Sequence, residues 1–168
     1  MLLFAHLGLT LIAARFLRWI DPRFLAVGAL LPDIIDKPLG LLIYGSMGHG
    51  RIFAHTLLFL SILTATSLAL RDQRAASLSI GVLSHLLLDT IWLSPAILLW
   101  PLLGPFPPAD SLDTLSYIEM LLMGLRDPEI LLPECAGFIY LIYILRPEMR
   151  RLRGPAQIPT TLSIWERF

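Results

Sequence analysis

The stretch GALLPDIIDKPLG, residues 28–40, places two aspartates, a lysine and two prolines inside a long apolar segment that extends over residues 24–44. A segment of this length and apolarity is typical of a helix that crosses a bilayer. Ionisable side chains inside such helices are costly and mark functional sites, so Asp33 and Asp36 are candidate site residues. The prolines predict a broken or kinked backbone beside a hydrated pocket.

The composition of the whole chain also favours a membrane protein. Hydrophobic residues make up 56% of the 168 residues, charged residues make up 15%, and the mean hydropathy is +0.73. A soluble domain has roughly a quarter charged residues and could not bury this much apolar surface at this size. The formal net charge is zero, so no overall field attracts nucleic acid. Cys135 is the single cysteine, which excludes an internal disulfide.

Five apolar segments predict an all-α integral membrane helical bundle of about five transmembrane helices. Between the fourth and fifth segments, the prolines of residues 93–110 forbid one regular helix. Residues 111–125 are too polar to span and predict one interfacial helix, with Asp110 or Ser111 as its N-cap. The five segments are residues 2–20, 24–44, 52–70, 75–93 and 130–145.

The placement of arginines predicts the orientation of this bundle in the cell (inner) membrane. Cytoplasmic loops accumulate Lys and Arg close to the helix ends. Under five crossings, three groups of arginines fall on one side, which we expect to be cytoplasmic. The N-terminus, the loop with His49 and Arg51, and the connection over residues 104–128 then face outward. The three groups are Arg15, Arg18 and Arg23; Arg71 and Arg74; and Arg146, Arg150, Arg151 and Arg153.

Under this topology, ionisable residues from all five segments fall in one layer near the outward face. Each charge at the bilayer centre costs on the order of 2.5–3.5 kcal/mol, so the four acids of this layer need partners. Lys37 and Arg51 can compensate two of them, but a divalent cation held by carboxylates and neutral imidazoles neutralises the cluster more completely. The layer therefore predicts a metal site. Its members are His6, Asp33, Asp36, His55, His85, Asp89 and Glu134.

Spacing within two segments supports a shared ion, although each residue also has a plainer explanation. His85 and Asp89 stand four positions apart, and Asp33 and Asp36 three apart, so each pair shares one helix face. The plainer roles are a hydrogen-bonded pair for His85 with Asp89, an ion pair for Asp36 with Lys37, a helix cap for Glu134, a headgroup anchor for Arg51, and solvated side chains for His6 and His49.

Four stretches resemble the YdjM-type membrane-bound metal-dependent hydrolase family. They are AHLGLT (residues 5–10), GALLPDIIDKPLG (28–40), GHGRIFAHTLLF (48–59) and GVLSHLLLDTIW (81–92), followed by the Pro-rich LLWPLLG (98–104). Their order and spacing carry the resemblance. Family members often read Pro-Asp-Ile-Asp-His and Thr-His-Ser. Here the second acid comes one position later, Lys37 replaces the His, and His55 lies between Ala54 and Thr56.

The family looks related to zinc-dependent phospholipase C, so the resemblance implies metal-assisted hydrolysis of a phosphoester in a lipid or lipid-linked substrate. The expected cofactor is a divalent metal, Zn²⁺ or Mn²⁺, and the expected partner is membrane lipid rather than nucleic acid. One domain is expected over residues 1–168, with a metal-site core at 5–104 and a C-terminal helix and tail at 105–168. The expected metal ligands are His6, Asp33, His55, His85, Asp89 and Glu134. The expected catalytic residues are Asp36 or His49 as proton acceptor and Arg51 as the group that holds the anion.

Two other functions fit the same residues. One is a membrane interaction or regulatory protein with a structural metal, which agrees with the description of the resembled family as LexA-binding. A closed coordination shell would favour it, because a catalytic site keeps one position open. The other is a small ion or proton transporter that uses intramembrane carboxylates. An inverted repeat would favour a transporter, and the sequence shows none.

The orientation can be tested with reporter fusions. A reporter that works only in the cytoplasm is expected to be active when it is fused after Arg153, because all three arginine groups predict that this side is cytoplasmic. A second fusion in the loop at Arg71 should report the same side. Activity of an exported-only reporter at Arg153 would invert the topology and place the candidate site on the cytoplasmic side.

Overall fold

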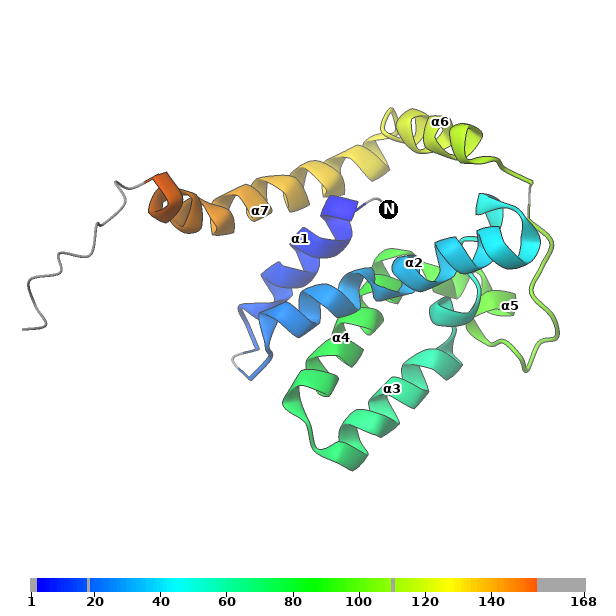
Figure 1. Ribbon diagram of the computed structural model, residues 1–168, viewed down its shortest axis with the longest axis horizontal. Coiled ribbons are helices and arrows are strands. Elements are labelled where there is room, and N and C mark those ends of the chain that lie inside the picture. Colours follow the sequence, from blue (N-terminus) through cyan, green and yellow to red (C-terminus); the bar gives the residue numbers. More distant parts are fainter. Residues whose placement is uncertain (1–2, 18, 110, 154–168) are drawn as a thin grey trace, which may run out of the picture.

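The computed structural model describes residues 3–17, 19–109 and 111–153, with only the backbone for 13, 47 and 147–153 (Figure 1). Arg18, Asp110 and the side chains of Arg150, Arg151 and Arg153 fall outside this description. Within it the chain is all-α, as predicted, with no strand. The helices are α1 (Leu3–Ala14), α2 (Pro22–Tyr44), α3 (Leu57–Leu70), α4 (Gln73–Leu88), α5 (Pro95–Leu98), α6 (Thr114–Gly124) and α7 (Pro128–Arg153), and the 3₁₀ turns are η1 (Met47–His49), η2 (Phe53–His55) and η3 (Ile91–Leu93).

Helices α2 and α4 make the most extensive contact of the bundle, and two glycines allow it. A Cβ on Gly28 would lie 2.1 Å from the Leu78 carbonyl oxygen, and one on Gly81 would lie 2.4 Å from the Leu25 carbonyl oxygen. Small residues at a helix crossing let the two backbones approach closely, which is a common packing mode of membrane helices. Helix α3 packs on α4, and α1 packs on α2 (Figure 1).

Helix α7 returns to the N-terminal part of the chain and packs along α1 (Figure 1). The two helices touch at Gly8 and Gly137, where a Cβ on Gly8 would lie 2.3 Å from the Cα of Gly137. The Glu134 carboxylate accepts hydrogen bonds from the backbone N–H groups of Phe4 and Ala5 at 3.0 and 3.1 Å. These are N-terminal N–H groups that have no partner within their own helix. The C-terminal helix therefore packs directly on the segment that was predicted to form the metal-site core, residues 5–104.

Helix α2 continues through both of its internal prolines, Pro32 and Pro38, so of the predicted break or kink the break is wrong, and the kink stays a prediction. Each proline removes one backbone N–H donor, but the remaining intrahelical hydrogen bonds hold the helix. Asp21 caps its start by accepting from the Arg23 N–H at 2.9 Å, and Gly45 ends it with a left-handed φ of 64°.

The fifth predicted segment, residues 130–145, is longer in the structure, as α7. The other predicted helices are shorter, and the first ends at Ala14 instead of residue 20. The third begins at Leu57 instead of residue 52, because the N–H groups of the preceding turn bond elsewhere. The fourth ends at Leu88 instead of residue 93, where Thr90 adopts a φ of 50°. The helix predicted to be interfacial begins at Thr114 with Asp113 as N-cap, which corrects the prediction of Asp110 or Ser111. The hydrogen bond from Ser116 to the Asp113 carboxylate holds the pKa of Asp113 below its usual value.

One stretch of the described residues, Pro128–Arg146 in α7, is long and apolar enough by itself to cross a membrane. Helices α1 and α3 are apolar but have 12 and 14 residues, and α2 has 23 residues but carries ionisable side chains. Large apolar side chains are nevertheless exposed over much of the surface. Among them are Phe16, Leu42, Leu68, Leu93, Leu102, Leu115 and Leu132.

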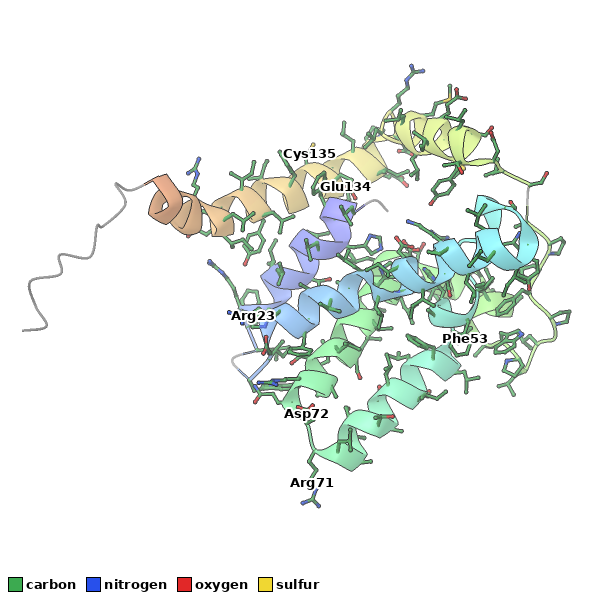
Figure 2. All side chains as sticks on the ribbon, in the orientation of Figure 1. Arg23, Phe53, Arg71, Asp72, Glu134 and Cys135 are labelled. Atoms are coloured by element: carbon green, nitrogen blue, oxygen red, sulfur yellow. The ribbon has the colours of Figure 1, made fainter. Side chains whose placement is uncertain are left out.

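The loops at the predicted cytoplasmic side lie together at one end of the molecule. The Gln73 amide donates to the Trp19 carbonyl oxygen, and the Asp21 N–H donates to the Ser77 hydroxyl at 2.9 Å. Figure 2 shows Arg23 and Arg71 at this end, away from Glu134. The loops that carry the first and second arginine groups of the prediction are thus neighbours in space.

The glycine crossing gives a testable consequence for stability. Gly28→Ala is expected to destabilise the protein by about 1–3 kcal/mol, because the new Cβ would meet α4 backbone that cannot move aside. The measurement is the thermal unfolding midpoint in detergent micelles. Gly124→Ala is the matched control, since its Cβ would meet only a flexible Ile130 methyl at 3.5 Å. Equal midpoints for the two variants would contradict the role given to the crossing.

Candidate metal centre

Five of the six predicted metal ligands lie together, and they come from four different elements. Helices α1 and α2 contribute His6 and Asp33, the η2 turn contributes His55, and α4 contributes His85 and its C-cap residue Asp89. The four residues other than Asp33 are buried. Their donor atoms form two groups that share His85, and within each group all atoms lie within 4.8 Å of one another. The groups are His6, His85 and Asp89, and Asp33, His55 and His85.

The two buried imidazoles His55 and His85 are oriented so that their Nε2 atoms face each other at 3.2 Å. The Nδ1 atom of His55 lies 2.7 Å from a carboxylate oxygen of Asp36, and that of His85 lies 2.7 Å from the carbonyl oxygen of Ala29. These oxygens can only accept, so each Nδ1 carries the hydrogen. A neutral imidazole then presents a lone pair at Nε2. Two such lone pairs repel at this distance, and a shared cation removes the repulsion.

The distances around this pair suit a tetrahedral ion. The Asp33 Oδ1 atom lies 3.8 Å from Nε2 of His55 and 4.0 Å from Nε2 of His85. Donors bonded to tetrahedral zinc lie roughly 3.3–3.6 Å from one another, given bonds of about 2.0–2.2 Å. Only small side-chain movements would therefore bring Asp33, His55 and His85 onto one ion. Two imidazoles and a carboxylate are also a donor set that zinc accepts.

The Asp36 carboxylate orients the His55 ring through its Nδ1 atom, the ring nitrogen that does not face His85. It is fully buried, and it accepts the His55 ring N–H together with the backbone N–H groups of Ile52, Ala54 and His55 at 2.8–3.1 Å. A second carboxylate that fixes the far nitrogen of a ligating imidazole is a common support of metal sites. With its oxygens filled in this way, Asp36 is better suited to positioning than to the predicted role of proton acceptor. Its predicted partner, Lys37, bonds Asp33 instead at 2.7 Å.

The Asp89 carboxylate also adjoins the imidazole pair. Its Oδ1 atom is 3.0 Å from His6 Nε2, and its Oδ2 atom is 2.9 Å from the Arg51 guanidinium. The Oδ2 atom is also 3.8 and 3.9 Å from the Nε2 atoms of His55 and His85. The side chain of Arg51 is 45% exposed, whereas Asp89 is buried. Arg51 therefore stands at the rim of the cluster and Asp89 inside it.

Two predicted site residues stay outside the cluster. Glu134 caps the N-terminus of α1 rather than its own helix, so it supports the helix that carries His6 without joining the donor groups. His49 lies in the η1 turn, where its ring stacks on Tyr44 with the ring centroids 4.3 Å apart.

One participant in the centre was missed from the sequence, namely the Ala29 carbonyl oxygen that fixes the ring of His85. A backbone acceptor leaves no mark in a search for ionisable side chains. The signal that could have found it is the small pair Gly28 and Ala29, because small residues permit the close approach of a second helix.

Comparison with known proteins identifies the family of the chain. The family model described as YdjM inner membrane protein matches residues 1–148. A search of curated proteins found no match, and neither did a search of solved structures. The matched range includes all donor residues and reaches into α7, which confirms the resemblance inferred from the four stretches. The chain belongs to the YdjM inner membrane protein family.

Proposed function

We propose that the chain is an integral membrane hydrolase that binds a divalent metal, Zn²⁺ or Mn²⁺, and hydrolyses a phosphoester of a lipid or lipid-linked substrate. One observation carries this proposal. The Nε2 atoms of His55 and His85 face each other at 3.2 Å, and both Nδ1 atoms are already hydrogen-bonded to other groups. A divalent ion bound there would act as a Lewis acid and lower the pKa of a water molecule toward neutrality.

The residues divide into those that hold the ion and those that orient the holders. Asp33, His55 and His85 would hold the ion, and a fourth position would stay open, as catalytic zinc sites require, because Asp89 Oδ2, at 3.8 and 3.9 Å from the same Nε2 atoms, is already bonded to Arg51. Asp36 and the Ala29 carbonyl keep the two imidazoles in the tautomer that has a free Nε2. An open position favours the hydrolase over an interaction protein with a saturated structural metal.

The remaining members of the cluster act on the substrate and its proton. The pair formed by His6 Nε2 and Asp89 Oδ1, 3.0 Å apart, would accept the proton of the attacking water, because it adjoins the imidazole pair and joins an imidazole to a carboxylate. Arg51 holds the substrate's anionic group at the rim. His49, the other predicted proton acceptor, stays a prediction. Asp89 also stays a predicted metal ligand. The Asp89→Asn variant separates this role from its role in accepting the proton.

Membrane burial of the bundle is supported by its surface and by its family. Exposed Leu, Ile and Phe side chains on α2, α3 and α7 are costly in water and neutral in lipid. We propose that the five predicted segments cross with the short helices lengthened by their adjoining 3₁₀ turns, and with local thinning of the bilayer. We propose that the site opens toward the outer leaflet with the N-terminus outside, because the loops with Arg15, Arg23, Arg71 and Arg74 lie beside each other and carry the positive charge expected on the cytoplasmic side.

Metal content and turnover test the proposal together. Protein purified without chelators is expected to hold about one divalent ion per chain, and His85→Ala should lose it, because the variant removes a shared donor. Asp89→Asn should keep the ion and lose metal-dependent turnover of phospholipids, lipid pyrophosphates or soluble phosphoesters. Elemental analysis and product assays on the same samples provide the readouts. Native protein with bound metal and no Asp89-dependent turnover would support a structural metal instead.

The positioning role of Asp36 has its own test. Asp36→Asn is expected to weaken metal binding roughly 10–100-fold, because the amide cannot accept all the hydrogen bonds that orient His55. Affinity is measured by competition with a chromophoric chelator. Asp21→Asn is the control, since asparagine is an equally good N-cap and Asp21 lies at the opposite end of α2. Unchanged metal affinity in Asp36→Asn, with the control also unchanged, would remove Asp36 from the metal centre.

A further inference from the structure

The two oxygen atoms of the Asp33 carboxylate have different neighbours. The Oδ2 atom accepts a hydrogen bond from the Lys37 ammonium group at 2.7 Å. The Oδ1 atom lies 3.8 Å from Nε2 of His55 and 4.0 Å from Nε2 of His85. The bond to Lys37 therefore holds the carboxylate in a rotation that directs one oxygen toward the imidazole pair and keeps the other oxygen occupied.

Lys37 is itself fixed by its own helix and by α6. It stands four positions after Asp33 in α2, and an acid followed by a base at this spacing shares one helix face with it. Its Nζ atom lies 6.0 Å from the centroid of the Tyr117 ring of α6, and a cation is attracted to such a ring. The side chains of Lys37 and Asp33 are 32% and 28% exposed, so solvent and salt screen this pair less than a fully exposed one.

The Asp89 carboxylate is arranged differently. Its Oδ2 atom, which lies 3.8 and 3.9 Å from the same two Nε2 atoms, is also the oxygen that bonds Arg51. Its Oδ1 atom lies 3.0 Å from Nε2 of His6. For Asp33, by contrast, the cation and the imidazole pair lie at different oxygens. The pairing with Lys37 thus occupies Oδ2 of Asp33 and leaves Oδ1 for an ion.

The number of carboxylate oxygens that reach an ion affects which ion binds. Zinc in proteins is mostly four-coordinate, so two imidazoles, one carboxylate oxygen and one further ligand complete its shell. Mn²⁺ favours six-coordinate sites rich in oxygen, and a carboxylate that turns both oxygens inward suits such an ion better. Most nitrogen and oxygen sites bind Zn²⁺ more tightly than Mn²⁺ in any case. The informative quantity is therefore the change of the affinity ratio in a variant.

We propose that Lys37 is a positioning residue that favours Zn²⁺ over Mn²⁺, because it holds one oxygen of Asp33 and leaves a single oxygen for the ion. This inference rests on the proposed function and narrows its metal. The charge of Lys37 would by itself weaken the binding of both ions alike, since they carry the same charge. The affinity ratio thus separates the effect of orientation from the effect of charge.

The experiment measures the affinities of the full-length protein in detergent micelles for Zn²⁺ and for Mn²⁺. Each is determined by competition with a chelator of known affinity, without any substrate. Lys37→Gln removes the charge and keeps a hydrogen-bond donor four positions from the aspartate. Lys37→Met and Lys37→Ala remove both the charge and the donor, and either one serves if the other does not fold. Arg23→Met is the control at the far end of α2 (Figure 2).

Lys37→Met and Lys37→Ala are expected to lower the ratio of Zn²⁺ to Mn²⁺ affinity roughly tenfold or more. The reason is that loss of a group that orients a metal ligand typically costs about 10–100-fold in affinity, and the freed second oxygen offsets this loss for Mn²⁺. Lys37→Gln should keep most of the native ratio, because its amide can still donate to Oδ2. Arg23→Met should leave the ratio unchanged.

Two results would overturn the proposal and leave the proposed metal hydrolase in place. One is a native affinity ratio in Lys37→Met and Lys37→Ala. The other is an equal fall of the ratio in Lys37→Gln, which would assign the effect to charge. Native protein that binds neither ion would refute the proposed function as well. Because the native protein is measured first and without substrate, the failure of the proposed function is distinguishable from the failure of the role given to Lys37.

Discussion

The buried Asp36 carboxylate is the interaction on which the rest of the centre depends. A buried carboxylate is tolerated when hydrogen bonds satisfy its oxygens, and here three backbone N–H groups and the His55 ring do so. Those N–H groups cannot also belong to an α-helix, so the chain forms the η2 turn and α3 begins only at Leu57. The same carboxylate fixes the His55 tautomer. One side chain on α2 thus determines a helix boundary and the direction of a metal donor.

The crossing of α2 and α4 supplies the second fixed imidazole. Because Gly28 and Gly81 have no side chains, the two backbones come close enough for the Ala29 carbonyl oxygen to accept the hydrogen of His85 Nδ1 at 2.7 Å. One imidazole is thus oriented by a carboxylate and the other by the main chain. The facing Nε2 atoms result from contacts with two points of α2, Asp36 and Ala29. Neither contact depends on a bound ion.

Each charged group of the cluster has a partner of opposite sign or a set of donors, which explains how an apolar molecule tolerates so many of them. Lys37 neutralises Asp33 within α2, and Arg51 neutralises Asp89 across the bundle. Glu134 is satisfied by the N-terminus of α1, where the helix dipole also favours a negative charge. The cations stand at the rim and the imidazoles inside, so the cluster has an accessible side and a buried side.

The sequence by itself determined the all-α class and the layer that contains His6, Asp33, His55, His85 and Asp89, because helix rise converts spacing along the chain into depth. It could not determine the roles of Asp36 and Glu134. Both carboxylates bond backbone N–H groups of distant segments, and every residue type except proline offers the same N–H. The start of α3, the continuity of α2 through its prolines and the Ala29 contact were likewise decided by the tertiary structure, since each depends on which backbone groups packing brings together.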